Sequence, residues 1–371
     1  MRDFDASPAH PDPLPAQGEE GSGAARQESE GTSAPLKNPE RRDRLARFLA
    51  DAAGARSAEI TELRRLPGGA VQENWLVAAV IDGAAHELVL RTDAATALSM
   101  SRDRAAEFAI QRLAHGAGVT VPEPLFLCCD PTVIGKPFFL MRWMPGLADG
   151  QRVVAGEVGG PRDAMATRLA RELARIHAIR PSRDAVAHLG SPPADAAQAR
   201  LRPLARFIET HAEPHPVAEW GVRWLLHHAP PPVAPVLCHG DFRTGNYLAD
   251  ERGFTALLDW EFACWSDPDE DIGWFCLGYW RFGAYGREAG GLVPRAIFHR
   301  AYEAASGRPV DPARARYWEV MAALRWLVIA LEQRDRFLLG GERSLQLLLN
   351  GRRPAECELE ILRLTQSAEA S

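Results

Sequence analysis

The residues with the clearest chemical potential lie in one short segment, His239–Asn246, whose sequence is H-G-D-F-R-T-G-N. Asp241 supplies a carboxylate, and Asn246 supplies an amide oxygen five residues later. Residues 247–258 then read as two short strands around a polar turn, and Asp259 comes directly after them. Because an antiparallel hairpin returns its second strand beside the start of its first, we predict that Asn246 and Asp259 are neighbours.

An amide oxygen next to a carboxylate oxygen forms a ligand pair suited to a hard cation such as Mg²⁺. Asp241 can then face a substrate hydroxyl beside a metal-bound phosphate, which is the arrangement used in phosphoryl transfer. We therefore predict Asp241 as the catalytic base and Asn246 and Asp259 as Mg²⁺ ligands. The alternative is a polar loop whose side chains make only turn hydrogen bonds. His239 is predicted to hold the loop by hydrogen bonds rather than to act as an acid or base.

The composition bounds the class of protein that carries this loop. A chain of 371 residues that is 46% hydrophobic and 25% charged is typical of a soluble enzyme with two lobes or domains. It contains neither an apolar run long enough for a membrane span nor a secretory signal, so we expect a cytoplasmic protein without a membrane partner. Residues 1–40 hold three basic and eight acidic residues, which leaves the rest of the chain close to neutral and argues against a nucleic-acid partner. The six cysteines show no C-x-x-C spacing, which disfavours a structural zinc site.

The order of the predicted elements favours an α+β fold with two lobes. Residues 1–37 are rich in Pro, Gly, Ser and Glu and are predicted to be a disordered tail. Helical patterns dominate beyond residue 145, whereas β-type segments dominate before it. The elements expected before residue 145 are a helix at 38–53, strands at 60–66, 74–81, 87–91 and 138–141, and a helix at 102–113.

Three motifs together resemble those of the aminoglycoside phosphotransferase and choline kinase superfamily, a branch of the protein-kinase-like fold. They are His239–Asn246, the segment L-D-W-E at 258–261, and D-P-x-x-D at 267–271. The resemblance extends over most of residues 60–340. It implies a bilobal fold with a small β-rich N-lobe at 38–144 and a larger helical C-lobe at 145–371, and it implies that ATP binds between them.

The resemblance also places the nucleotide-covering loop at L-P-G-G-A-V-Q-E-N, residues 66–74. Gly68, Gly69 and Asn74 are the residues of this loop that would contact the cofactor. No Walker A sequence occurs in the chain, which argues against a P-loop kinase.

Further cofactor contacts follow from the same resemblance. Arg91 occupies the strand position where many kinases have a lysine that contacts the phosphates, and Glu107 on the next helix would pair with it. The alternative for Glu107 is an exposed helix residue. Arg142 and Met144 fall at the lobe connection, where the family binds the adenine ring through its backbone. Arginine at position 91 resembles the branch that occurs fused to, or alongside, acyl-CoA dehydrogenases.

Two more residues are expected to support the loop. The resemblance places Asp271 behind the catalytic loop as a brace, and Arg243 lies within the loop itself. Residues 267–270 read as a capping box at the start of a helix, so Asp267 is predicted to be structural. The aromatic residues at 274–282 are expected to pack in the core or to form a wall of the acceptor pocket.

These observations predict an ATP- and Mg²⁺-dependent kinase that phosphorylates a hydroxyl group of a small molecule. A hydroxyacyl-CoA is the favoured acceptor, and aminoglycosides and amino alcohols are the alternatives. A non-catalytic nucleotide-binding pseudokinase is the rival from another class, because Arg91 replaces lysine. The acceptor prediction depends on a mixture of aromatic side chains and arginines, which suits an anionic, partly apolar molecule unless the arginines only solvate helix faces. These arginines are Arg281, Arg287, Arg295, Arg325, Arg334 and Arg336.

Overall fold

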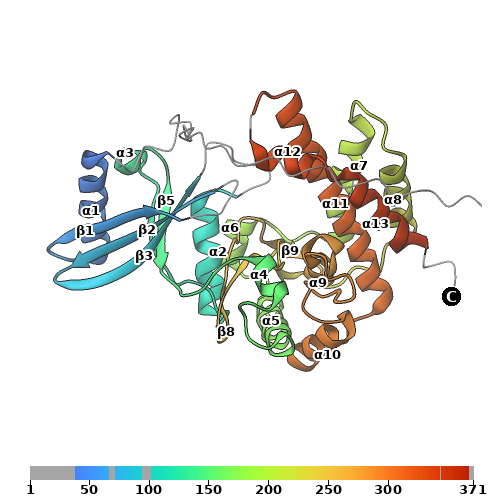
Figure 1. The fold of residues 1–371 in the computed structure, drawn as a ribbon, viewed down its shortest axis with the longest axis horizontal. Helices are drawn as coiled ribbons and strands as arrows, with labels where there is room; N and C mark the ends of the chain where they lie inside the picture. Colours follow the sequence, from blue (N-terminus) through green and yellow to red (C-terminus); the bar gives the residue numbers. More distant parts are fainter. Residues whose placement is uncertain (1–37, 67–71, 94–101, 343, 367–371) are drawn as a thin grey trace, which may run out of the picture.

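The N-terminal part of the chain is built on one antiparallel sheet (Figure 1). The computed structural model describes residues 38–66, 72–93, 102–342 and 344–366. The strands pair in the order β1-β2-β3-β5-β4, and every pairing is antiparallel. Their bounds are β1 (Ala58–Arg65), β2 (Gln72–Ile81), β3 (Ala84–Asp93), β4 (Pro124–Cys128) and β5 (Phe138–Arg142).

Local sequence explains the central hairpin of this sheet. Asp82 and Gly83 have φ angles of 47° and 83°, which is the conformation that a two-residue hairpin turn requires. The turn joins β2 and β3 as the sequence predicts. β4 was not predicted, because it is short and begins at Pro124, which lacks the N–H that a ladder needs.

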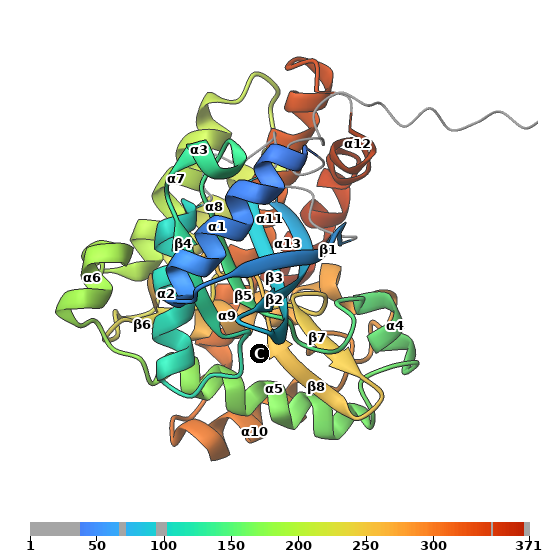
Figure 2. The same cartoon turned by 90° about the vertical axis from the view of Figure 1, so that its left-hand side faces the viewer.

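Helices cover both faces of the sheet. α1 (Pro39–Ala53) begins at Asn38, whose side chain accepts a hydrogen bond from the Glu40 amide at 2.9 Å, and ends at Gly54 in the left-handed region. It packs with Leu90 and Leu140 on one face, whereas α2 (Arg104–Gly116) packs with Val89 and Met141 on the other. Neighbouring residues of a strand point to opposite faces, so one strand serves both helices. Figure 2 shows α1 in front of the sheet.

The C-terminal part is mainly helical, and α11 is its longest element with 27 residues. α11 is buried on most of its surface, and α7, α8, α9, α12 and α13 pack around it (Figure 1). The short α3 (Pro131–Ile134) belongs to the N-terminal part. The other helices are α4 (Gly150–Ala155), α5 (Arg162–His177), α6 (Arg183–Leu189), α7 (Ala196–Thr210), α8 (Pro216–His227), α9 (Asp269–Cys276), α10 (Arg295–Ser306), α11 (Pro312–Leu338), α12 (Leu345–Gly351) and α13 (Pro354–Gln366), with a 3₁₀ turn at Gly278–Arg281.

Two small sheets hold the segment with the candidate chemistry. β6 (Val236–Cys238) pairs with β9 (Cys264–Ser266), and β7 (Tyr247–Asp250) pairs with β8 (Gly253–Leu257). His239–Asn246 therefore connects two paired strands and is fixed at both ends. Within the described ranges, no helix combines the length and apolarity needed to cross a membrane. The architecture is the predicted α+β arrangement with a β-rich and a helical part.

Candidate active site

The loop between β6 and β7 approaches a neighbouring segment so closely that it needs glycine. Gly240 has a φ of 76°, and a Cβ atom at this position would lie 2.2 Å from the carbonyl oxygen of Phe262. Only glycine avoids both the strained backbone and the clash. The close contact fixes the backbone just before Asp241 against the segment that follows Asp259.

His239 and Asp271 hold the loop from behind. Asp271 is fully buried on α9, and its carboxylate accepts hydrogen bonds from the backbone amides of His239 at 2.7 Å and Gly240 at 2.9 Å. His239 Nε2 donates to the carbonyl oxygen of Leu258 at 2.9 Å, and its Nδ1 accepts from the Asp241 amide at 3.3 Å. These contacts link the loop to the end of β8 through the imidazole ring. This geometry agrees with the structural role predicted for His239 and with the brace predicted for Asp271.

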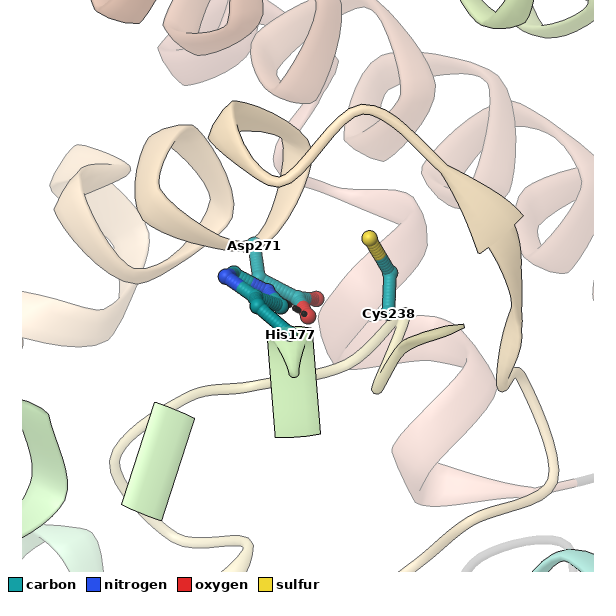
Figure 3. Close-up of side chains that lie close together, drawn as sticks. All are labelled: His177, Cys238 and Asp271. Atoms are coloured by element: carbon teal, nitrogen blue, oxygen red, sulfur yellow. Dashed lines mark hydrogen bonds and ion pairs between the residues drawn. The ribbon is translucent and has the colours of Figure 1, made fainter. Parts of the chain in front are cut away.

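A second histidine extends this network into the core. His177 Nε2 lies 3.2 Å from Asp271 Oδ2, and its Nδ1 lies 2.8 Å from the hydroxyl of Tyr302. Cys238 completes a buried trio with His177 and Asp271 (Figure 3). Burial and the nearby Asp271 raise the pKa of the Cys238 thiol well above its usual value, and the thiol donates to the carbonyl oxygen of Asp267. Both imidazole nitrogens, the thiol and the carboxylate already make hydrogen bonds within the protein, so this trio fits a hydrogen-bonded support better than a metal site.

Asp241 lies at the centre of a set of hydrogen-bond donors. Its Oδ1 accepts from Trp274 Nε1 at 2.7 Å, and Arg243 Nε lies 3.2 Å from the same oxygen. The amide nitrogen of Asn246 donates both to Asp241 Oδ2 and to the Asp241 carbonyl oxygen. The Arg243 guanidinium stacks over the ring of Trp280, with 4.5 Å from Cζ to the ring centroid. The carboxylate is therefore oriented by side chains from both the loop and α9.

Trp274 is a positioning residue that the sequence did not single out. We expect Trp274→Phe to lower kcat about tenfold, because one hydrogen bond to a carboxylate is lost while the ring volume is largely kept. Steady-state kinetics would show this as a change in kcat with little change in KM for the nucleotide. Trp318→Phe, which alters another buried tryptophan, is the matched control. Equal kcat values for the Trp274 and Trp318 variants would contradict the assignment.

The hairpin brings Asn246 beside Asp259, as the sequence predicts. Tyr247 pairs with Leu257, and the Leu258 amide donates to the Asn246 carbonyl oxygen at 2.9 Å. Asp259 follows with a φ of 62°, which is uncommon for a residue other than glycine. Such strain is found at functional positions where the surrounding structure fixes the backbone.

The oxygen donors at this position fit a Mg²⁺ ion. The amide nitrogen of Asn246 is occupied by Asp241, which leaves its Oδ1 as the ligand atom. Burial raises the pKa of Asp259, but the charges of Arg91 and Arg243 outweigh that effect and lower it, so the carboxylate is ionised at neutral pH. One amide oxygen and one ionised carboxylate are suitable hard ligands.

An ion-pair network connects this position to the sheet and to α2. Arg91 Nε lies 2.9 Å from Glu107 Oε1, and its NH2 lies 2.8 Å from Asp259 Oδ1. Burial lowers the pKa of Arg91, but the charges of Glu107 and Asp259 more than compensate and raise it. Arg104 also pairs with Glu107 and lies 2.9 Å from Asp93. Glu107 is fully buried, so the alternative of an exposed helix residue is wrong.

Three other predicted cofactor residues lie in the described part of the chain: Asn74 near this network, and Arg142 and Met144 at or just after the end of β5. Asn74 Oδ1 is 3.5 Å from Arg91 NH1. Arg142 is exposed and pairs with Glu123 at 2.8 Å, so its side chain is engaged away from the loop. Among the described residues, neither the backbone amide nor the carbonyl of Met144 has a main-chain partner, which leaves both available to a ligand. Gly68 and Gly69 lie outside the described residues.

Two expectations need correction. The helix α9 begins at Asp269, and Glu270 pairs with Arg200 at 2.9 Å instead of closing a capping box, although Asp267 is structural as predicted because its Oδ1 accepts from the Asp269 amide at 3.0 Å. The arginines considered for an anionic acceptor also do not form one unpaired cationic surface, because most of them have partners within the protein, some of these at its surface. Arg281 pairs with Glu360, Arg295 with Glu319, Arg334 with Glu213 and Arg336 with Glu342, whereas Arg287 donates to the carbonyl oxygens of Gly291 and Val154.

Solved structures with the same architecture are protein-kinase-like phosphotransferases. A crystallised protein of Ralstonia eutropha assigned as an aminoglycoside phosphotransferase is similar with a TM-score of 0.70 and 20% identity, covering 88% of this chain and 98% of that one. The aminoglycoside phosphotransferase APH(4)-Ia, solved with AMP-PNP and hygromycin B, is similar with a TM-score of 0.60 and 17% identity, covering 88% and 99%. These likenesses confirm the predicted bilobal fold.

Sequence comparison identifies the family. Residues 62–323 match the model of the phosphotransferase enzyme family, and the chain belongs to that family. This confirms the predicted family and enzyme class. The chain is 28% identical over 249 residues to acyl-CoA dehydrogenase family member 10 of Mus musculus, and 24% identical over 252 residues to family member 11 of Pongo abelii. Each match covers 64% of this chain, but only 22% and 32% of those relatives.

Proposed function

We propose that the protein transfers the γ-phosphoryl group of ATP to a hydroxyl group of a small molecule, with Mg²⁺ as the metal. The observation that supports this is the pair of contacts made by Arg91, which binds Glu107 and Asp259 at the same time, beside the loop that carries Asp241. They support a site in which a phosphate-orienting cation, two metal ligands and a base would act together, as phosphoryl transfer requires. The structural neighbour solved with AMP-PNP supports ATP as the nucleotide.

Each residue has a defined part in this reaction. Asp241 accepts the proton of the acceptor hydroxyl while the hydroxyl oxygen forms a bond to the γ-phosphorus of ATP. The bond between the γ-phosphorus and the β–γ bridging oxygen breaks, and ADP leaves. Asn246 and Asp259 would hold the metal, which neutralises charge on the phosphates when bound. Arg91 orients phosphate oxygens, and the backbone of Met144 contacts the adenine ring. Met144 ends the nucleotide-binding lobe, 38–144, and residues 145–371 form the acceptor lobe.

We favour a hydroxyacyl-CoA as the acceptor. The relatives in sequence are named as acyl-CoA dehydrogenase family members, which associates this type of chain with acyl-CoA chemistry. Aminoglycosides and amino alcohols are the second candidates, because structural neighbours are aminoglycoside phosphotransferases and a choline/ethanolamine kinase family protein. A pseudokinase is disfavoured, since Asp241, Asn246 and Asp259 are all present.

An ADP-release assay with Mg-ATP tests the acceptor. We expect a 4-hydroxyacyl-CoA to be phosphorylated with a kcat/KM above about 10⁴ M⁻¹s⁻¹, which is the lower range for competent enzymes. Kanamycin and choline should give values at least about a hundredfold lower. The acyl-CoA without a hydroxyl group is the matched control and should release no ADP above background. Efficient turnover of kanamycin with none of the hydroxyacyl-CoA would disprove the acceptor assignment but not the kinase reaction.

A further inference from the structure

A cavity of about 430 Å³ lies behind the catalytic loop and is lined by basic side chains. Its walls are formed by the start of α2 and the residues just before it, by α6, α7 and α11, and by the segment that follows Asp259. Arg102, Arg200 and Arg325 line it from three of these elements. Phe262, whose carbonyl oxygen approaches Gly240, also lines it, so the cavity and the catalytic loop share one wall.

The three arginines are incompletely neutralised. Arg102 donates to the backbone carbonyl oxygens of Ala263 at 2.8 Å and His188 at 3.4 Å, which carry no full charge. Arg200 pairs with Glu270 at 2.9 Å, and the same carboxylate is 3.9 Å from Arg325. Two neighbouring guanidinium groups thus share one carboxylate.

Arg325 is the best-buried of these cations. It is 7% exposed, it donates to the Gly240 carbonyl oxygen at 2.7 Å, and it stacks on Trp274 at 4.4 Å. Its Nε has no hydrogen-bond partner within the described part of the chain, although it is buried. Burying such a donor without a partner costs free energy.

The electrostatics of the cavity favour an anion. Burial lowers the pKa of Arg102 and of Arg325, and the positive charge of Arg200 lowers both further. Two carboxylates also lie on the wall, where Asp103 accepts from the Ala106 amide at 2.7 Å and Glu261 accepts from Gln72 at 2.7 Å, so the three guanidinium groups outnumber them. A bound anion would relieve the mutual repulsion of the arginines.

We propose that this cavity, which we term the arginine pocket, binds a phosphate group of a ligand. Guanidinium groups match phosphate oxygens with paired, charge-assisted hydrogen bonds, and the volume exceeds that of a single phosphate. The phosphate has two possible sources, a phosphate of the CoA acceptor or a free phosphate-type anion. The first source rests on the proposed function, whereas the second does not. Through Arg325 and Gly240, the pocket contacts the backbone that carries Asp241.

Calorimetric titration of the full chain tests the arginine pocket. The protein is saturated with Mg-AMP-PNP to block the nucleotide site, and inorganic phosphate, coenzyme A and dephospho-coenzyme A are then titrated. We expect at least one probe to bind, and Arg102→Gln to weaken it about tenfold, the usual scale for one charge-assisted contact. Arg102→Lys should restore part of the affinity because it keeps the charge. Arg223→Gln, which alters an exposed arginine on α8, is the matched control and should change nothing.

The probes separate the two sources. If coenzyme A binds at least tenfold more tightly than inorganic phosphate, the ligand is a phosphate of the CoA acceptor. If dephospho-coenzyme A then binds more weakly than coenzyme A, that phosphate is the 3′-phosphate. Comparable binding of inorganic phosphate identifies a free anion. Absence of binding by every probe, or equal affinities in wild type and Arg102→Gln, overturns the proposal. The readout needs no turnover, so a failure of the kinase assignment would appear separately, as a lack of ADP release.

Discussion

Asp241→Asn should reduce kcat by at least about 10²-fold while leaving the fold and nucleotide affinity intact. Asparagine keeps the shape of the side chain, and its oxygen can still accept from Trp274 Nε1. It can no longer take the proton of the acceptor hydroxyl, and the loss of a positioned acid–base group typically costs 10²–10⁴-fold. Single-turnover and steady-state phosphorylation assays, with a calorimetric titration of Mg-AMP-PNP, separate chemistry from binding.

Asp51→Asn is the matched control for this variant, because Asp51 is an exposed carboxylate on α1, far along the chain from the loop. Its kcat should equal that of the wild type. A thermal melt shows whether Asp241→Asn keeps the folded state, since its amide would face the donating nitrogen of Asn246. Near-wild-type turnover by a folded Asp241→Asn protein would remove Asp241 from the mechanism.

Local sequence signals predicted the parts of the fold that depend on local chemistry. Asn38 before Pro39 marked the start of α1, because few side chains can cap a helix, and Asp82-Gly83 marked the β2–β3 turn, because few residues adopt its positive φ angles. The neighbouring positions of Asn246 and Asp259 were also predictable, because a hairpin brings the residues at its two ends together. A helix or a turn signal acts over a few residues, so reading it needs no knowledge of the tertiary structure.

Contacts between distant segments were beyond such reasoning. Trp274 bonds to Asp241 across 33 positions of the chain, and nothing in an aromatic stripe distinguishes this ring from its neighbours. Arg325 was grouped with five other arginines as an acceptor surface, but the structure separates it from them. The other five have partners outside the cavity, whereas Arg325 lines the cavity and contacts the catalytic loop. The sequence shows how many charges are present but not which of them are neutralised.

Arg91 shows how the two kinds of information combine. The resemblance placed Arg91 on a strand and predicted that it pairs with Glu107 on the next helix. The structure adds a second partner, Asp259. The same guanidinium therefore links α2 to the hairpin through ion pairs on two of its nitrogens. A lysine has a single ammonium group and could not make this forked contact. Under the proposed function, the residue that orients phosphate would also hold a ligand of the metal.

This coupling sharpens what is expected of Asp259→Ala. The variant should weaken Mg²⁺-dependent ATP binding at least about tenfold, because a carboxylate ligand is removed from the ion. Metal-free ATP should bind no more weakly than to the wild type, since the variant also frees Arg91 NH2 for a phosphate oxygen. Arg91 keeps Glu107, so the fold should be retained. Calorimetric titrations with Mg²⁺ and with EDTA measure both affinities.

Asn246→Ala is the graded comparison for the same experiment. It should reduce the Mg²⁺-dependent affinity to a smaller degree, because a neutral amide oxygen binds the cation more weakly than a carboxylate. It leaves the Arg91–Asp259 pair in place, so metal-free binding should stay at the wild-type value. If both residues bind the ion directly, the gain in ATP affinity caused by Mg²⁺ should be largest in the wild type, smaller in Asn246→Ala and smallest in Asp259→Ala. An identical Mg²⁺ dependence in all three proteins would place the metal elsewhere and leave Asp259 as an anchor for Arg91 alone.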